Sequence, residues 1–315
     1  MPGQRTFHLG PEAARFGWSR DFEPAATVPS GAELVLEPPD SSGGQLHPGA
    51  TDDDVAALNF EHVNPVCGPV VVEGADPGDT LQVDILEMSP ATWGWTAQIP
   101  GFGLLSDQFP DPWVHTWTVP GSGPMEFLPG IAIPVAPFCG VIGLAPAEPG
   151  VHSVVPPRRV GGNLDVRHLG SGATLYLPVE VPGALLGLGD THAAQGDGEV
   201  CGTAVEAPMA VTLRLRVRKD LSLETPEYDL PGATRRAAAS TAGCHGTTGV
   251  GPDLFEAARQ AVMRMIDHLM RRHGLDAQHA YALCSIAVDL QISEIVDAPN
   301  WVVSALLPLD LFAGS

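Results

Sequence analysis

Basic residues are scarce in this 315-residue sequence. It has 16 Lys+Arg against 37 Asp+Glu, a formal net charge of -21 at pH 7, and Lys219 is the single lysine. Nucleic acid and anionic membranes repel a chain with this charge unless a strong local basic patch offsets it, and the sequence contains none. We therefore expect no nucleic-acid partner and no membrane partner.

Long apolar runs and paired cysteines are also missing. No stretch reaches the roughly 18 apolar residues of a membrane helix, and the first ten residues lack the apolar core of a signal peptide. The five cysteines are odd in number, widely spaced and without a CxxC pair, so they fit neither a disulfide framework nor a zinc finger. These absences predict a cytoplasmic protein whose cysteines are small buried residues.

Three common catalytic markers are absent as well. The chain has no G-x-S-x-G, the nucleophile elbow of the α/β-hydrolases. It has no Walker loop, and no G-x-G-x-x-G that opens a helix after a strand, so nucleotide binding lacks its marker. A serine-lysine amidase needs a base lysine, but Lys219 follows a strand-like run and has no neighbouring serine motif.

What is present indicates a mainly β fold, with sandwich or barrel-like layers. The 36 glycines and 31 prolines lie between short β-type runs and do not form low-complexity tracts. Residues 1–60 are rich in turns, with a possible strand at 32–36, and predict an irregular N-terminal segment. Residues 61–220 predict a β-rich catalytic core that binds a metal. Within it, the run from 69 to 88 predicts a hairpin with one buried face.

The C-terminal residues 221–315 predict a small α+β portion packed on the core, so that the whole chain is one compact unit. Apolar residues recur at helical spacing between Asp253 and Gly274, which is typical of a helix with a cap at each end. A second helix is expected over 276–289, and residues 301–312 return to a strand-like pattern.

Ionisable residues concentrate between residues 160 and 206. The run G-G-N-L-D-V-R places Asn163 and Asp165 two residues apart, so on a strand they would share a face. The next run contains four carboxylates and one imidazole, with three glycines between them. The ionisable residues are Asp190, His192, Asp197, Glu199 and Glu206. A divalent cation needs several deprotonated ligands that converge from a tight backbone, and this set predicts a metal site. The alternative is an acidic loop that faces solvent.

Two histidines outside this run are further candidates. His62, in H-V-N-P-V-C-G-P, is either an acid/base group or a hydrogen-bonded structural residue before a turn. His245, in G-C-H-G-T-T-G, could bring its imidazole or the next helix N-terminus toward a substrate, or it could belong to a capping loop. His268 lies near a helix end and is expected in solvent.

Tryptophan is concentrated in residues 91–120, a loop-rich stretch bounded by Pro100 and Pro110. Four of the six tryptophans lie there together with two phenylalanines, namely Trp93, Trp95, Trp113, Trp117, Phe102 and Phe109. One interpretation is an aromatic loop over the core. The other is an apolar pocket wall or lid, because ligand sites are lined mostly by such groups.

The sequence resembles the acetamidase/formamidase family. The matching blocks are V-N-P-V-C-G-P-V-V-V-E-G-A-D-P-G-D-T-L, P-G-F-G-L-L-S-D-Q-F, C-G-V-I-G-L-A-P, G-G-N-L-D-V-R, G-D-T-H-A-A-Q-G-D-G-E-V-C-G-T-A-V-E and S-I-A-V-D-L-Q-I-S-E-I-V-D. They extend from about His62 to Phe312. The G-D-x-H-A-x-Q-G-D-G-E block is the most specific, and Cys67 stands where we would expect threonine or a similar residue.

The resemblance implies a metal-dependent amidohydrolase that cleaves a small linear amide to a carboxylate and ammonia. The implied metal ligands are Asn163, Asp165, Asp190 and His192, and the implied acid/base candidates are Glu199, Glu206 and His62. The candidate substrate-binding residues are Trp93, Trp95, Phe102, Trp113 and His245. We expect a divalent metal, zinc or else calcium, and a homo-oligomer, a dimer or larger. The alternative is a non-catalytic β-sandwich that binds calcium or a sugar, because acidic glycine-rich loops also form calcium sites.

Overall fold

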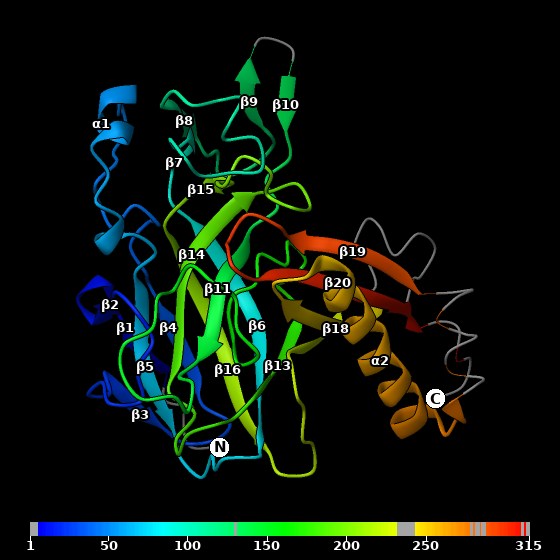
Figure 1. The fold of residues 1–315 in the computed structure, drawn as a ribbon. Helices are drawn as coiled ribbons and strands as arrows, with labels where there is room; N and C mark the ends of the chain where they lie inside the picture. Colours follow the sequence, from blue (N-terminus) through cyan, green and yellow to red (C-terminus); the bar gives the residue numbers. More distant parts are fainter. Residues whose placement is uncertain are drawn as a thin grey trace.

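The computed structural model describes residues 6–128, 131–231, 243–277, 280, 284, 288–309 and 312. The regular structure of the described chain is mainly β, in two large sheets that lie face to face (Figure 1). The mainly β prediction is confirmed. None of the helices in the described ranges is long and apolar enough to cross a membrane.

The first sheet contains nine strands in the order β1-β4-β16-β6-β13-β17-β18-β20-β19. In that order the strands span Thr6–Leu9, Glu33–Leu36, Met209–Arg218, Thr80–Pro90, Thr174–Pro178, Glu227–Leu230, Cys244–Gly251, Trp301–Pro308 and Asp289–Glu294. The N-terminal segment therefore contributes to this sheet, because β4 lies between β1 and β16 and includes most of the strand expected at 32–36.

The second sheet follows the order β12-β11-β14-β15-β7-β8, and β5 pairs with β14 and with the short strands β2 and β3. These strands span Gly161–Asn163, Phe138–Leu144, Leu186–Ala194, Val205–Glu206, Trp93–Gln98, Trp113–Thr118, Val66–Val72, Ala14–Arg15 and Ala26–Val28. A separate two-stranded ribbon consists of β9 (Met125–Leu128) and β10 (Ile131–Ile133).

Apolar side chains from the two sheets form the main core. Leu213 and Leu215 of β16 and Leu186 and Leu188 of β14 are fully buried in one cluster. All nine residues of β14 are buried, so its polar residues at 190–192 lie inside the protein. Burial of polar side chains is costly unless they are paired, and this stretch therefore indicates a functional site.

The predicted hairpin over residues 69–88 is wrong. Its two strands exist as β5 and β6, but β5 pairs in the second sheet and β6 pairs with β13 and β16 in the first. The turn at 75–79 therefore carries the chain from one sheet to the other. A local turn pattern and an alternating strand do not show which partner each strand takes.

The tryptophan-rich stretch contains more regular structure than the sequence indicates. Strands β7 and β8 pair antiparallel, with Trp93 opposite Thr118 and Gln98 opposite Trp113. The residues between the two strands form a loop, and Pro100 and Pro110 both lie in that loop.

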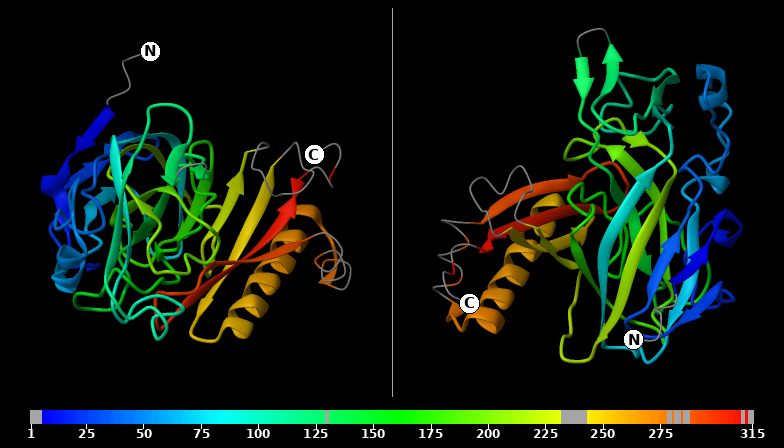
Figure 2. Two further views of the ribbon diagram at one scale, coloured as in Figure 1. Left: turned by 90° about the horizontal axis from the view of Figure 1, so that it is seen from above. Right: turned by 180° about the vertical axis from the view of Figure 1, so that it is seen from behind.

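The long C-terminal helix is confirmed. Helix α2 (Leu254–His273) begins after Asp253, whose side chain accepts a hydrogen bond from the Glu256 backbone N–H at 2.8 Å, and it ends at Gly274 with φ 68°. Its buried face packs on β20 beside the sandwich (Figure 2). The second helix expected over 276–289 lies largely outside the described residues.

Three shorter helices lie in the N-terminal segment: the 3-10 turns Pro11–Ala13 and Phe60–His62, and α1 (Asp52–Ala56). Four of the five cysteines are buried as expected, and Cys201 is half-buried.

Candidate active site

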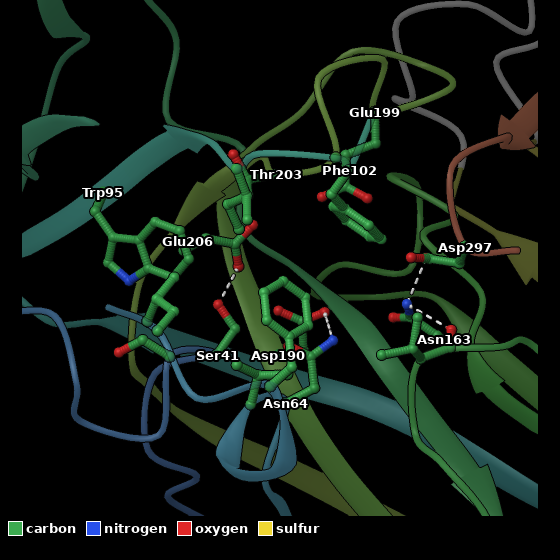
Figure 3. Close-up of a pocket in the computed structure, with 17 residues that line it drawn as sticks. Ser41, Asn64, Trp95, Phe102, Asn163, Asp190, Glu199, Thr203, Glu206 and Asp297 are labelled. Carbon is green, nitrogen blue, oxygen red and sulfur yellow. Dashed lines mark hydrogen bonds between the residues drawn. The ribbon is translucent and has the colours of Figure 1, made fainter. Parts of the chain in front are cut away.

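A small cavity opens where the N-terminal segment meets the second sheet (Figure 3). Its volume is about 40 Å³. A water molecule needs about 10–15 Å³ on this scale, so the cavity has room for about three waters or a small molecule of similar size. Its polar lining includes Ser41, Asn64, Asp190, Glu199, Glu206 and Asp297.

Carboxyl groups dominate this cavity. Six buried carboxyl side chains lie in or directly behind its wall, namely Asp165, Asp190, Glu199, Glu206, Glu294 and Asp297, together with the imidazole of His192. No lysine or arginine is among the described residues that line the cavity. Unpaired buried charge is very unfavourable, so the group must bind protons or a cation.

Strand β14 supplies the centre of this group. Asp190 and His192 are two residues apart on the strand, and the Nε2 atom of His192 lies 3.0 Å from Asp190 Oδ1. The same Nε2 lies 3.0 Å from Glu206 Oε2, because β15 pairs with β14 at this position. The imidazole is fully buried, and the ring of Phe138 contacts it edge to face.

Gln195 contacts the opposite edge of the imidazole, at Nδ1. The Gln195 Oε1 atom lies 2.9 Å from His192 Nδ1, while Gln195 Nε2 donates to the backbone oxygen of Asp165 at 3.0 Å. Because the Gln195 amide nitrogen is used by that oxygen, its carbonyl faces the ring, and Nδ1 is the donor. The remaining ring atom, Nε2, faces the two carboxylates.

Glu206 is fixed by two hydrogen bonds from different parts of the chain. Ser41 Oγ donates to Glu206 Oε2 at 2.8 Å, and the backbone N–H of Ala204 donates to Oε1 at 2.7 Å. Ser41 belongs to the turn that contains Asp40, whose carboxylate accepts a hydrogen bond from Trp95 Nε1 at 3.1 Å. The N-terminal turn therefore forms one wall of the cavity.

Asn163 and Asp165 do not share a strand face, contrary to expectation. Asn163 is the last residue of β12, and its amide nitrogen donates to the carboxylate of Asp297 and to the backbone oxygen of Val155. Asp165 has left the strand, with φ 45°, and its Oδ1 lies 3.8 Å from His192 Nδ1. Neither carboxylate oxygen of Asp165 has a hydrogen-bond partner among the described residues.

Glu199 and Asp197 occupy different environments although they are two residues apart. Glu199 is 7% exposed and lines the cavity. Asp197 is half-buried in the turn before it, 3.9 Å from the Arg167 guanidinium. Only Glu199 lies where it can contact a molecule in the cavity.

The pKa values of these groups follow from burial and mutual repulsion. Burial raises the pKa of Asp165 and of Glu206 to about 7, and it raises the pKa of Glu199 well above its ordinary value. Burial disfavours the charged form of His192, but the carboxylates of Glu206 and Asp190 outweigh it and raise the His192 pKa well above its ordinary value. The Nε2 side of His192 therefore attracts a positive charge strongly.

Backbone strain is concentrated at the same place. Four non-glycine residues at the site have φ between 45° and 47°, namely Asn64, Asp165, Asp190 and Glu199. This left-handed conformation is unfavourable for ordinary residues and persists where the surroundings enforce it, often at functional sites. The strain aims these four side chains into or beside one small volume.

Gly140 leaves space that the site needs. A Cβ atom at this position of β11 would lie 2.7 Å from Asp165 Oδ1 and 2.8 Å from His192 Cε1. Such distances are too short for any stable contact. Only glycine allows the two ionisable side chains to approach β11 this closely.

Three overlapping sets of ligand atoms lie close enough to hold a metal ion, each with all its atoms within 4.8 Å of one another. The sets are Asp165, Asp190 and His192; His192, Glu199 and Glu206; and Asp165, Glu199 and Asp297. The first two contain the imidazole, and the third offers only carboxylate oxygens. The donor set therefore fits a divalent metal.

The chain matches known proteins over nearly its whole length. A model of the acetamidase/formamidase family matches residues 5–153 and 148–314. The chain belongs to this family. The resemblance noted in the sequence is thus confirmed.

Solved structures and curated members of the acetamidase/formamidase family are similar to this chain. An acetamidase from Bacillus halodurans is 33% identical, with a TM-score of 0.88, and 97% of this chain and 98% of that chain are covered. A predicted acetamidase/formamidase from Thermoanaerobacter tengcongensis has the same identity and TM-score, with 98% and 97% covered. The formamidase of Methylophilus methylotrophus is 27% identical over 94% of this chain and 88% of its own.

Four aromatic residues were expected at the substrate pocket, and only two of them line the cavity. Trp95 and Phe102 are on its wall. Trp113 instead lines a separate cavity of about 1010 Å³, together with Trp117, and Trp93 packs half-buried in a small apolar cluster beside Trp95. Strand alternation separates Trp113 from Trp95, because successive side chains of a strand point to opposite faces of the sheet, whereas Trp93 and Trp95 share one face.

His62 and His245 lie outside the cavity of this family member. His62 is exposed at the end of a 3-10 turn, with its ring 5.1 Å from that of Phe16, while its neighbours Val63 and Asn64 line the cavity. His245 is on β18 in the C-terminal part, buried beside Glu227. The turn aims His62 outward, and the strand order separates His245 from β14.

Several polar residues that line the cavity were not predicted from the sequence, among them Ser41, Asn64, Thr203 and Asp297. Asn64 and Asp297 lie inside blocks that carry the family resemblance, which was a usable signal. Ser41 lies in an ordinary turn-rich segment, and no local pattern predicts its contact with Glu206, which is 165 positions away.

Proposed function

We propose that this protein hydrolyses a very small linear amide, of the size of formamide or acetamide, with the help of a divalent metal ion. Its family is a family of hydrolases that act on linear amides, which sets aside the alternative of a non-catalytic binding module. The observation that carries the metal requirement is the group of six buried carboxyl side chains around one imidazole, without a basic residue in the described cavity wall.

The proposed metal ligands are His192, Asp190 and Glu206. Two ligand atoms at about 2.0–2.2 Å from a tetrahedral zinc ion lie about 3.4 Å apart, close to the 3.0 Å between His192 Nε2 and each carboxylate oxygen. An imidazole with carboxylates suits zinc, whereas the oxygen-only set of Asp165, Glu199 and Asp297 would suit calcium. We therefore favour zinc at His192.

A bound metal would polarise the amide carbonyl and make a coordinated water more acidic. The chain itself supplies the proton transfers. Glu199 takes a proton from the attacking water and delivers it to the amide nitrogen, so that the C–N bond breaks and ammonia and a carboxylic acid leave. Glu206 is a poorer candidate for this role because Ser41 and Ala204 already hold both of its oxygens.

The cavity wall explains why the substrate must be small. Trp95 and Phe102 close the apolar side, and Asn64 offers an amide group for the polar end of the substrate. Asn64 Nδ2 is only weakly engaged, at 3.4 Å from Asp190 Oδ2, and can turn toward a bound amide.

Ammonia release with metal analysis tests this proposal. The purified protein should release ammonia from formamide or acetamide, lose activity after treatment with a chelator, and recover it with zinc. His192→Ala should lose both turnover and about one equivalent of zinc while it keeps its β-rich circular dichroism spectrum. Full turnover in chelated, metal-free protein would contradict the metal requirement.

A further inference from the structure

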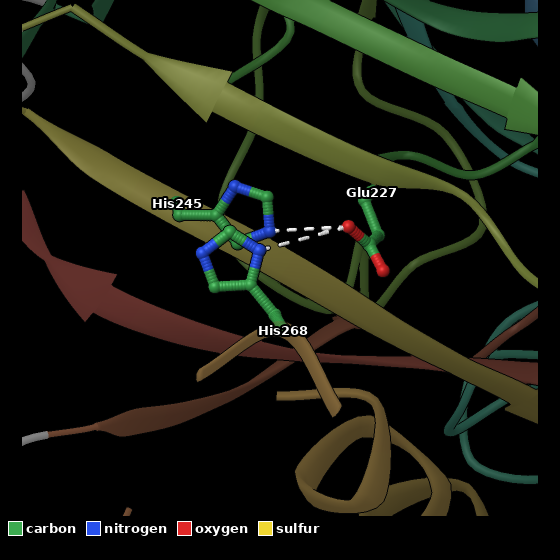
Figure 4. A group of neighbouring side chains, drawn as sticks. All are labelled: Glu227, His245 and His268. Atoms are coloured by element: carbon green, nitrogen blue, oxygen red, sulfur yellow. Dashed lines mark ion pairs between the residues drawn. The ribbon is translucent and has the colours of Figure 1, made fainter. Parts of the chain in front are cut away.

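A second cluster of ionisable side chains lies in the C-terminal part of the molecule, outside the active-site cavity (Figure 4). It combines Glu227 of β17, His245 of β18 and His268 of α2. Their exposed fractions are 4%, 4% and 8%. His268 was expected in solvent near a helix end, but it lies on the helix face that packs against the sheet.

The contacts of His245 leave one of its ring nitrogens without a hydrogen bond in the described structure. Its Nδ1 atom donates to Asp229 Oδ1 at 2.7 Å. Its Nε2 atom faces Glu227 Oε2 at 3.3 Å, but within the described part of the chain this nitrogen has no hydrogen bond. A carboxylate that accepts from one imidazole nitrogen while the other faces a ligand group is the arrangement found behind metal-bound histidines.

His268 directs its Nδ1 atom to the same carboxylate oxygen. The distance to Glu227 Oε2 is 3.9 Å, too long for a hydrogen bond. The two imidazole rings are stacked, with centroids 3.5 Å apart and an interplanar angle of 17°. His245 Nε2 and His268 Nδ1 are therefore both directed at the carboxylate of Glu227.

We propose that Glu227, His245 and His268 form a second metal site, of the zinc class, distinct from the active site. The three ligand atoms lie within 4.8 Å of one another. The 3.3 Å between His245 Nε2 and Glu227 Oε2 matches the spacing of about 3.4 Å for two ligands of a tetrahedral zinc ion. Imidazole nitrogens and a carboxylate oxygen are ligands that zinc prefers.

Small movements complete this site. A metal lies in the plane of each imidazole that binds it, so the stacked rings must tilt apart by rotation of His268 on its helix. The Arg271 guanidinium, 3.1 Å from Glu227 Oε2 and 3.5 Å from Oε1, shifts to Oε1 when Oε2 binds the metal. A water molecule fills the fourth position.

A metal at this site would cross-link parts of the fold. The three ligands come from two neighbouring strands and from the helix that packs beside them, so a bound metal joins α2 to the first sheet. This site would stabilise the C-terminal part and would take no part in the chemistry. Its loss should change stability and metal content but leave the rate per folded enzyme unchanged.

Metal counting in a variant without the active-site imidazole tests the site. His192→Ala protein, dialysed against chelator and then equilibrated with zinc, should retain about one zinc per chain. Adding His268→Ala or His245→Ala should abolish this binding, whereas adding His8→Ala, which removes an exposed imidazole paired only with Glu37 in the described structure, should not. No zinc in the His192→Ala parent, or equal zinc in all three double variants, would overturn the second site and leave the active-site proposal standing.

A second measurement covers variants that fold poorly. His268→Gln keeps a polar group of similar size. Zinc at about 100 times its Kd should raise the Tm of the His192→Ala parent by on the order of 5 °C, and it should not raise that of His192→Ala/His268→Gln. Cobalt in the parent should give visible absorption bands that the His268→Gln change removes. An equal Tm rise and unchanged bands in both proteins would refute the assignment.

Discussion

Gln195 lies against the Nδ1 edge of His192, with 2.9 Å between its Oε1 atom and the ring nitrogen. The same amide donates to the backbone of Asp165, so one side chain fixes both the position and the tautomer of the buried imidazole. Through this contact Nε2 remains directed at the two carboxylates, where the proposed metal binds.

Replacing Gln195 should weaken the metal site without removing a ligand. Gln195→Leu leaves Nδ1 without its partner, so the ring can turn or change tautomer. We expect the zinc affinity at His192 to fall by about 10–100-fold, the usual cost of losing a group behind a ligand. Competition titration with a zinc indicator measures this change. An unchanged affinity, together with unchanged turnover, would show that packing alone orients the ring.

Glu199→Gln should reduce kcat by about 10²–10⁴-fold, the contribution of a positioned acid/base group. The amide keeps the size of the side chain but cannot carry the proton. Asp197→Asn is the matched control, because Asp197 lies two residues away in a half-buried turn, and its kcat should change less than threefold. Steady-state ammonia release on acetamide compares the two. Similar losses in both variants would argue against the assignment of Glu199.

Phe102→Ala should shift the preference toward longer amides. Removal of the ring enlarges the apolar side of the cavity, and each methylene that it then accommodates is worth about 0.8 kcal/mol, or about fourfold in kcat/KM. Butyramide has two more methylenes than acetamide, so the ratio of kcat/KM for butyramide to that for acetamide should rise by roughly 15-fold. Trp113→Ala, in the larger separate cavity, should leave this ratio unchanged. If Trp113→Ala alone changes the ratio, the substrate binds in that other cavity.

Gly140→Ala should inactivate the enzyme through a single methyl group. The added Cβ meets Asp165 Oδ1 at 2.7 Å, so the carboxylate and the imidazole must move. Displacements near 1 Å at a catalytic group can cost about 10² in rate, and overpacking costs about 1–3 kcal/mol of stability. Gly121→Ala, which meets nothing within 4 Å, is the control. The rate and the Tm of both variants decide the matter, and wild-type turnover by Gly140→Ala would rule out the steric argument.

The sequence allowed part of the site to be predicted. Asp190 and His192 could be placed together because their spacing of two on a strand puts both on one face. Asn163 and Asp165 have the same spacing but not the same outcome, since β12 ends at Asn163 and Asp165 lies beyond it. Strand periodicity is informative only where the strand continues.

Pairing between distant segments was the part that could not be predicted. Ser41 reaches Glu206, and Asn163 reaches Asp297, 134 positions away, because the sheets bring these segments together. The turn between β5 and β6 likewise has the pattern of a hairpin although it connects two sheets. Local patterns predict strands and turns, but the choice of neighbours depends on how the whole core packs.

Asp297 lies between β19 and β20, the last two strands in the described part of the chain, yet it forms part of the cavity wall. The wall is therefore complete only after this final strand pair has joined the first sheet. A growing or clipped chain that stops before β19 lacks that wall, even when its sandwich has formed. Catalytic competence therefore depends on the strand pair β19 and β20 as well as on the strands that carry Asp190 and His192.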